Sequence, residues 1–482
     1  MTAAVGARVY RLGEFHSFEG GGRKFLYLVP AGAIFEQDES VGALMGQLSG
    51  GEVPHDELVG RLVAGGMGSE AAEELIEEMF EARVIVTGDS RPAPLENPPA
   101  DFPLQSLVMN LTNQCNLSCQ YCYEFGEDKV ATPDGKPKFM DFETAKASVD
   151  FLLQSSNGRE AVGITFFGGE TLMNYPLLKQ VVTYATEQAA ARGQRVDFSL
   201  TTNATLLTPT IIEFLSENRI GVTVSMDGPA ELHDKLRVFA NGKGSYDIIA
   251  PKVKALIASH RTRATTARVT LTAGVTDVVK IFRHLKQDLG FHEVGFAPVT
   301  TSPDRLYSIN DKGMDGVLEQ FHILADEWLD YALRGQMHGF SNVSDTISEL
   351  YQGVNKSHPC GAGLGLVGVG PSGDIAPCHR FVDSDVHALG HISTGIDKTK
   401  QNDFLSRGHI NTKYDCHTCW ARPLCAGGCH HEAFVRYGDT GHPNLHYCDW
   451  IRDWTDTCLR IYGTVNALNP GFLEQFAERK AL

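Results

Sequence analysis

Residues 107–122 read LVMNLTNQCNLSCQYC, an apolar stretch that runs directly into three closely spaced cysteines. The apolar residues 107–111 predict a buried strand, so Cys115, Cys119 and Cys122 belong to the loop that follows it. Three thiolates from one loop can hold three irons of a cubane cluster and leave the fourth iron open to an outside ligand. A structural zinc site would need a fourth protein ligand, and the sequence offers none nearby. Cysteines that only fill a core would have no reason to recur at this spacing.

The composition is that of a globular chain. Its 482 residues are enough for two or three domains with large cores, and 42% apolar with 21% charged residues excludes a disordered or fibrous protein. No apolar run approaches the length of a membrane helix, and the N-terminus lacks the layout of a secretory signal. The formal net charge of −17 disfavours nucleic acid and anionic lipid as partners. Eleven cysteines without a signal peptide indicate metal or redox chemistry in the cytoplasm.

Strands and helical patterns alternate from Leu104 to about Ser302. Six strands are predicted, at 107–111, 163–167, 197–201, 221–225, 269–273 and 294–297. Helical patterns lie between the strands, for example at 142–153 and 210–218. This alternation predicts an α/β fold with a parallel, barrel-like sheet and the chemistry at the carboxyl ends of its strands.

The remaining segments differ from the barrel pattern. Strands at 24–30 and 33–36 precede three short helical patterns, the last of which has Ser69 as its predicted N-cap, and together they indicate a winged-helix-like unit. We therefore expect a small α+β domain at 1–88, a proline-rich linker at 89–104, the partial barrel at 105–310, a helical bridge at 311–355, a cysteine-rich domain at 356–450 and a helical tail at 451–482.

A second group of cysteines fills the C-terminal third of the chain. Its members are Cys360, Cys378, Cys416, Cys419, Cys425, Cys429 and Cys448. On spacing alone, the run Cys416–Cys429 could also form a zinc ribbon. Cys458 falls outside the spacing, and we expect it to pack in a helix.

The first cysteine set, with Tyr121 before its last member, resembles the signature of radical S-adenosylmethionine (SAM) enzymes, which implies a partial (β/α)6 barrel and one [4Fe–4S] cluster that binds SAM. The stretch Gly168-Gly169-Glu170 resembles the GGE motif of that family, and the stretches Thr201–Ala204 and Ser225–Pro229 are similar to segments that contact SAM. By themselves these stretches could also be ordinary turns or strand ends, and Arg237 a solvated charge. The resemblance implies the following SAM contacts: Tyr121, Gly168, Gly169, Glu170, Asn203, Ser225 and Arg237.

The second cysteine group resembles the SPASM domain of peptide-modifying radical SAM enzymes, which implies two auxiliary [4Fe–4S] clusters. By this resemblance one cluster is bound by Cys416, Cys419, Cys425 and Cys448, and the other by Cys360, Cys378 and Cys429. The second auxiliary cluster would then keep one iron for His379 or for a substrate thiolate, and we favour the thiolate.

The N-terminal unit resembles the RiPP recognition element, a module that binds a leader peptide as an added strand on its sheet edge. The residues that carry this resemblance are 25–35 and the helices that follow. A domain that only supports the barrel is the alternative. A DNA-reading winged helix is disfavoured because the segment is rich in Glu and Asp and has no basic recognition helix.

Domain order, length and the run Cys378-His379-Arg380-Phe381 together resemble the quinohemoprotein amine dehydrogenase maturases. This resemblance implies thioether bonds between cysteine sulfur and methylene carbons of Asp or Glu in a leader-bearing, cysteine-rich partner, the gamma subunit of that dehydrogenase. It also implies an electron donor such as flavodoxin or ferredoxin. Asp234 and Asp227 are candidates for the base that takes the thiol proton. A six-cysteine-peptide maturase, a sulfatase maturase that makes formylglycine, and a zinc or iron–sulfur scaffold without activity stay open as alternatives.

Overall fold

The computed structural model describes residues 8–88, 95–96, 98–99, 101–132 and 134–477. Much of the expected proline-rich linker, 89–104, therefore lies outside the described residues. Within the described ranges, no helix combines the length and the apolar character that crossing a membrane requires.

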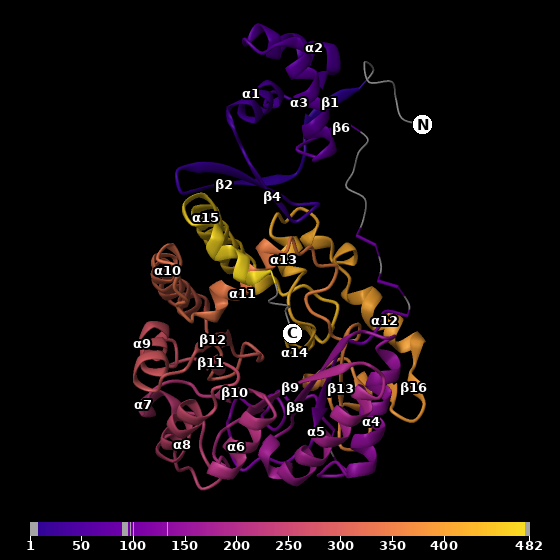
Figure 1. The fold of residues 1–482 in the computed structure, drawn as a ribbon, viewed down its shortest axis with the longest axis vertical. Coiled ribbons are helices and arrows are strands. Elements are labelled where there is room, and N and C mark those ends of the chain that lie inside the picture. Colours follow the sequence, from indigo (N-terminus) through magenta and orange to yellow (C-terminus); the bar gives the residue numbers. More distant parts are fainter. Residues whose placement is uncertain (1–7, 89–94, 97, 100, 133, 478–482) are drawn as a thin grey trace.

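The centre of the molecule is a ten-stranded sheet in which the six strands from the β12 edge to β7 run parallel. These six are β7 (Ser106–Asn110), β8 (Ala161–Phe167), β9 (Arg195–Thr202), β10 (Gly221–Ser225), β11 (Thr265–Leu271) and β12 (Glu293–Pro298). They lie side by side in chain order and form the lower half of the molecule in Figure 1. The predicted α/β fold with a parallel sheet is confirmed. The fifth strand begins four residues earlier than expected, because Thr265, Ala267 and Val269 alternate into the core.

The helices between these strands cover the outer face of the sheet (Figure 1). They are α4 (Phe142–Ser155), α5 (Tyr175–Ala190), α6 (Pro209–Glu217), α7 (Ala230–His233), α8 (Tyr246–Ser259) and α9 (Val278–Arg283). Side-chain oxygens of Asp141 and Thr208 accept from the first turns of α4 and α6, which fixes where those helices begin. Apolar strand residues such as Ile164 and Val224 are buried in the core, so the strands are anchored against their helices.

The cysteine-rich segment extends the same sheet, which the sequence pattern did not predict. Strand β13 (Leu366–Val369) pairs parallel with β7, with Val367 opposite Leu107. Strands β14 (Asp374–Ala376), β15 (Gly390–His391) and β16 (Gly395–Ile396) follow in antiparallel order. The helices of this region are α12 (Lys398–Gly408), α13 (Arg422–Cys425) and α14 (His430–Tyr437).

The N-terminal unit contains two small sheets and three helices. Strands β2 (Phe15–Gly20), β3 (Arg23–Leu28) and β4 (Ala33–Glu36) form one sheet, and β1 (Val9–Leu12), β5 (Val53–Pro54) and β6 (Ile85–Thr87) form the other. The helices are α1 (Glu39–Leu48), α2 (His55–Ala64) and α3 (Ser69–Glu81). The predicted N-cap of α3 is wrong: Gly68 occupies that position and Ser69 is the first helical residue.

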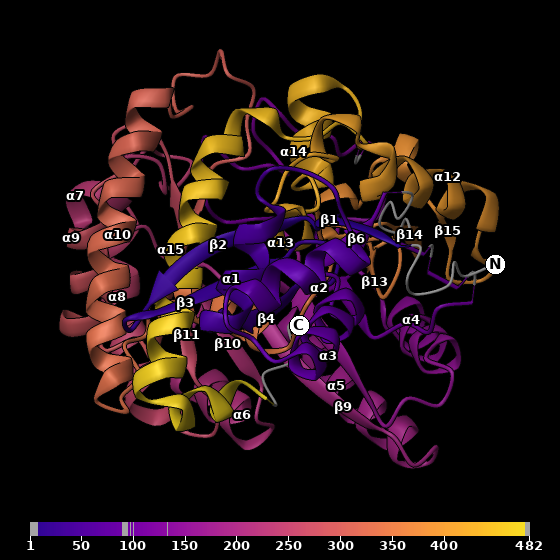
Figure 2. The same ribbon diagram turned by 90° about the horizontal axis from the view of Figure 1, so that it is seen from above.

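The last long helix joins the parts of the molecule. Helix α15 (Cys448–Leu468) lies beside α10 (Asp311–Leu333), with the β2–β3 sheet across it (Figure 2). It also contacts α11 (Ser341–Tyr351). The approach is close: a β-carbon on Gly463 would lie 2.9 Å from the Phe25 ring. His16 also pairs with Asp456 at 2.6 Å. The described part of the expected C-terminal tail, 451–477, thus packs between the N-terminal sheet and the helical bridge, and 478–482 lie outside the described residues.

Candidate active site

The first three cysteines lie on the loop that leaves the carboxyl end of β7. Cys115 and Cys119 line a cavity of about 1040 Å³. Burial raises the pKa of Cys115 to about 12 and that of Cys122 to about 11, so both thiols stay protonated at neutral pH unless a positive charge arrives. A cluster of irons supplies such a charge, and three half-buried thiols on one loop fit it. Their role as ligands stays a prediction.

Two glycines bring the next strand end against this loop. Gly168 has φ +143°, and a β-carbon there would lie 2.4 Å from the Thr112 carbonyl oxygen. A β-carbon on Gly169 would lie 2.3 Å from the Gln114 carbonyl oxygen. Only glycine permits this approach, which explains the residue type at both positions.

Glu170 is held at the same edge by hydrogen bonds from backbone and side chain. Its carboxylate accepts from the Leu172 N–H at 3.0 Å, the Thr202 hydroxyl at 2.7 Å and the Asn203 N–H at 2.7 Å. Burial raises the pKa of Glu170, while these donors oppose the rise. The carboxylate is therefore fixed in one position at the mouth of the barrel.

Asn203 completes the link between the strand ends and the cysteine loop. Its amide nitrogen lies 3.8 Å from the Cys115 sulfur and donates to Asn116 Oδ1 at 3.0 Å. Ser225 ends β10 and is only half-buried. The predicted SAM contacts of β8 and β9 thus converge on the cysteine loop, and their function stays a prediction.

A buried ion pair adjoins Cys119. Arg237 donates to Asp227 at 2.6 Å, and the Tyr121 hydroxyl donates to the same carboxylate at 2.5 Å. Burial raises the pKa of Cys119 and the Arg237 charge lowers it, so this arginine lies close enough to stabilise a thiolate. Arg237 is 8% exposed, so the alternative of a solvated surface arginine is wrong.

The two candidate bases are engaged in other contacts. Asp227 accepts from the Thr270 N–H at 2.9 Å in addition to Tyr121 and Arg237. Asp234 accepts from the N–H groups of Ser245 and Tyr246, at 2.8 and 2.9 Å, where α8 begins. A catalytic role for either carboxylate stays a prediction.

The cysteines of the C-terminal region separate into two sets. Burial raises the pKa of Cys378 to about 12, with further increases from Cys429 and Cys360. In the other set, burial and Cys425 raise the pKa of Cys416 to about 11, and Cys419 and Cys448 add to the rise. The residues in each set are the ones that the SPASM resemblance implies, and their ligand roles stay a prediction. Among the described residues, no three His, Cys, Asp or Glu side chains form a group that could hold a single metal ion.

Sequence reasoning missed a buried lysine between the two sets. Lys413 is 2% exposed, and its ammonium donates to the Ala426 carbonyl at 3.1 Å. Burial lowers the pKa of Lys413, whereas cysteines of both sets, Cys416 and Cys360 among them, raise it. A β-carbon on Gly427 would lie 2.5 Å from the Lys413 Cδ, so the glycine makes room for the lysine. The glycine pair before Cys429 was the only sequence signal for this packing.

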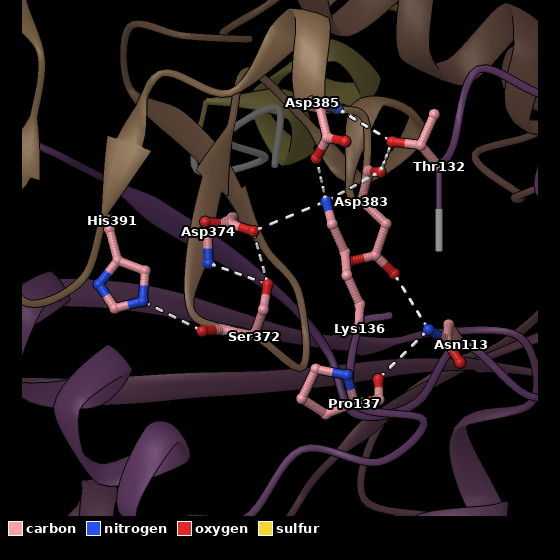
Figure 3. A network of polar contacts seen from close by, with 9 residues as sticks. All are labelled: Asn113, Thr132, Lys136, Pro137, Ser372, Asp374, Asp383, Asp385 and His391. Atoms are coloured by element: carbon pink, nitrogen blue, oxygen red, sulfur yellow. Dashed lines mark hydrogen bonds and ion pairs between the residues drawn. The ribbon is translucent and has the colours of Figure 1, made fainter. Parts of the chain in front are cut away.

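Polar contacts tie the cysteine loop to the cysteine-rich region (Figure 3). Asn113 donates to Asp383 at 3.3 Å. Lys136 pairs with Asp385 at 2.7 Å and donates to the Asp383 carbonyl at 3.1 Å. Thr132 donates to that same carbonyl at 2.9 Å. The segment after the first cysteines is thereby fixed against the second cysteine region.

Comparison with known proteins finds similar sequences and similar folds. The sequence profile of the radical SAM superfamily matches residues 109–296. The serine-type anaerobic sulfatase-maturating enzyme of Bacteroides thetaiotaomicron is 26% identical over 372 residues, which cover 72% of this chain and 86% of that protein. The cysteine-type enzyme of Clostridium novyi is 25% identical over 371 residues, with 73% and 94% covered.

Two solved structures share the fold. Histidine-tagged anSMEcpe with bound AdoMet superposes with a TM-score of 0.64 at 21% identity, covering 76% of this chain and 100% of that one. Streptococcus suis SuiB bound to its precursor peptide SuiA gives 0.50 at 14% identity, with 91% and 99% covered. The chain therefore shares its fold with anSMEcpe and SuiB, and its residues 109–296 match the radical SAM superfamily profile.

Proposed function

We propose that this chain is a radical SAM peptide maturase that forms thioether bonds between cysteine sulfur and methylene carbons of Asp or Glu. The proposed substrate is the leader-bearing small subunit of quinohemoprotein amine dehydrogenase. The observation that carries the proposal is that Glu170, Asn203 and the cysteine loop meet at the carboxyl ends of the parallel strands. A second cysteine-rich region extends the same sheet. Similarity to the SuiB–SuiA fold supports a peptide substrate.

The chain's own residues would bind and orient the reactants. Cys115, Cys119 and Cys122 would hold a [4Fe–4S] cluster, and Glu170 would pair with the ammonium group of SAM. When bound, the clusters and SAM supply an electron source, a 5′-deoxyadenosyl radical and an electron acceptor. In the balance, the substrate carbon would lose one hydrogen atom to the 5′-deoxyadenosyl radical, with 5′-deoxyadenosine as the product. The thiol loses one proton to a base, and one electron leaves as the carbon–sulfur bond forms.

The N-terminal unit is proposed to bind the leader. In its β2–β3–β4 sheet the outer strands β2 and β4 each pair with β3 alone, so a peptide strand could add at an edge. The position of this sheet across α15, whose first residue is Cys448, supports a link between leader binding and the cysteine region. Removal of the leader from the substrate should weaken its binding without changing SAM cleavage by the enzyme alone.

The test is the intact mass of the small subunit, leader attached, after anaerobic co-expression with this chain. Loss of two hydrogens per linkage, with those cysteines no longer alkylatable, is the expected result. An unchanged mass, with SAM still cleaved, would refute the substrate and leave another leader-bearing cysteine peptide, such as a six-cysteine peptide, as the target. Iron well below about twelve atoms per chain would remove a cluster from the proposal.

A second candidate is favoured by the similarity to the two sulfatase-maturating enzymes. A sulfatase maturase would oxidise one Cys or Ser of a peptide to formylglycine. The discriminating experiment offers a sulfatase-derived peptide to the loaded enzyme and traps aldehyde with a hydrazide. Aldehyde on that peptide, together with an unmodified small subunit, would replace the first proposal by the second.

A further inference from the structure

The β2–β3–β4 sheet of the N-terminal unit belongs to two different cores. Phe25 and Tyr27 of β3 lie in the core that α15 shares with the barrel, whereas Leu26 and Leu28 lie in the separate core of the N-terminal helices. Alternate residues of a strand point to opposite faces, so each face of the sheet is packed into one of these cores. The N-terminal unit is therefore packed against the C-terminal half of the chain and not merely tethered to it.

His16 is on the face of this sheet that meets α15, because it lies opposite Tyr27 in the register of β2 and β3. Its ring stacks on the Trp420 ring, with the ring centres 3.7 Å apart and the planes 6° from parallel. Its Nε2 lies 2.6 Å from the Asp456 carboxylate of α15. Trp420 directly follows Cys419 in the chain. One side chain of β2 thus contacts both the loop that carries Cys419 and helix α15.

Glu14 makes a second contact with that loop, through Arg422. Both terminal nitrogens of Arg422 donate to the Glu14 carboxylate, one to each oxygen, and Nη2 does so at 2.5 Å. Nη1 also donates to the Cys419 carbonyl oxygen at 3.1 Å. A guanidinium that binds a carboxylate with two parallel hydrogen bonds is held in one orientation, and the charges strengthen both bonds. Arg422 thereby joins the N-terminal unit to the backbone of a cysteine.

The loop from Cys416 to Cys425 has little regular structure of its own. Its helix α13 is a single turn of four residues, and a helix that short is not stable by itself. The chain leaves the loop through Ala426 at φ +46°, a conformation that is unfavourable for a residue other than glycine. The positions of Cys419 and Cys425 therefore depend on the side chains against which the loop packs.

We infer that Glu14 and His16 position the loop that carries Cys419 and Cys425, so that the N-terminal unit forms part of the auxiliary iron site expected on those cysteines. A cluster needs its thiolates at fixed positions, and fixing a loop only when the cluster arrives costs conformational entropy for every residue. Contacts that order the loop beforehand reduce this cost and favour retention of the cluster. The inference goes beyond the proposed function, because it concerns iron retention and needs no peptide substrate.

The test measures iron retention in the full chain without substrate. The protein is loaded anaerobically with iron and sulfide, and the transfer of iron to excess ferrozine is followed by absorbance. Glu14→Gln removes the charge of the ion pair. In this variant we expect about four of about twelve irons, those of one cluster, to leave about tenfold faster than in the unchanged chain, the effect of one charged hydrogen bond. His16→Ala, which removes the stacked ring, should accelerate the loss of the same irons.

Electron paramagnetic resonance shows which cluster is affected. In the reduced protein, the cluster on the first cysteine set is identified because SAM changes its signal, and that signal should be the same in every variant. One other signal should change its shape or midpoint potential in Glu14→Gln, which a loss of overall stability alone would not produce. Glu14→Asp keeps the charge on a shorter side chain, and its rate of iron loss should lie between those of Glu14→Gln and the unchanged chain.

Glu77→Gln is the matched control. Glu77 pairs with Arg8 at 3.0 Å inside the N-terminal unit, so this substitution also removes an ion pair of that unit. The control should lose iron at the rate of the unchanged chain. Thermal melts of the metal-free proteins show that each variant is folded.

Equal rates of iron loss from Glu14→Gln and Glu77→Gln would overturn the inference. An equal acceleration for all irons would also overturn it, because that result indicates general destabilisation. A content of about four irons in the unchanged chain would remove the auxiliary site, and the inference with it. The identity of the substrate is tested separately, by the mass of the co-expressed small subunit.

Discussion

Replacing Lys413 by methionine should stabilise the metal-free protein. The ammonium is buried beside thiols whose pKa values burial raises, so in the metal-free chain its charge has little compensation. An uncompensated buried ion costs several kcal/mol, whereas its hydrogen bond to Ala426 contributes about 1 kcal/mol. Methionine keeps most of the stem that packs on Gly427. The net expectation is a gain of about 1–3 kcal/mol in the free energy of unfolding.

Loading the protein with iron and sulfide should reverse the sign of this change in the free energy of unfolding. The thiols then become thiolates on both sides of Lys413, and the ammonium gains the counter-charge that the metal-free state lacks. Anaerobic thermal melts of the chelator-treated and the reconstituted protein, each with and without Lys413→Met, give the four values needed. The variant should melt higher than the unchanged chain when metal-free and lower when loaded.

Lys413→Gln, which is neutral but keeps a donor for the Ala426 carbonyl, is the matched control. It should stabilise the metal-free chain as methionine does. If both neutral variants lower the melting temperature of the metal-free chain, the charge is not the cost that the burial implies, and the reasoning fails.

Three further predictions follow from the site. Cys115→Ala should abolish 5′-deoxyadenosine release from SAM, measured by chromatography under reducing conditions, and persistent release would contradict the assigned loop. Gly168→Ala should destabilise the chain by at least about 2 kcal/mol in denaturant unfolding, because φ +143° and the Thr112 carbonyl leave no room for a β-carbon. Burial lowers the pKa of His233 to about 4. This histidine therefore lowers the free energy of unfolding as the pH falls from about 6.5 towards 4, because the unfolded chain then binds a proton that the folded chain does not. His233→Gln should therefore flatten unfolding free energy against pH in that window by up to about 3 kcal/mol, and an unchanged slope would exclude this histidine as its source.

Local patterns allowed much of the barrel to be predicted. The strand at 221–225 has the predicted bounds, because alternating apolar residues and flanking turns encode a strand within a few residues of sequence. The pairing of β13 with β7 joins residues more than 250 positions apart, and no local pattern of Val367 or its neighbours specifies that partner. The predicted N-cap of α3 was wrong for a related reason. Gly68 and Ser69 can both precede a helix, and tertiary context decides which of them is the N-cap.

The functional site was likewise predictable only where a local sequence pattern encodes it. Cysteines carry their chemistry in their spacing, so the two sets could be proposed from sequence alone. Lys413 is a single basic residue that belongs to no spaced motif, and most lysines are solvated at a surface. Its significance comes from its burial and from the cysteines around it, which only the folded chain brings together.

Helix α15 also fixes the distance between the N-terminal sheet and Cys448. It begins at Cys448, and the N-terminal sheet lies against it near Gly463, fifteen residues further along. At a rise of 1.5 Å per residue this separation is about 22 Å along the axis. An extended peptide spans about 3.3 Å per residue, so one that touched both positions would need about seven residues between them. The helix thereby sets a shortest spacing between a segment held on the N-terminal sheet and a residue delivered to the cysteines.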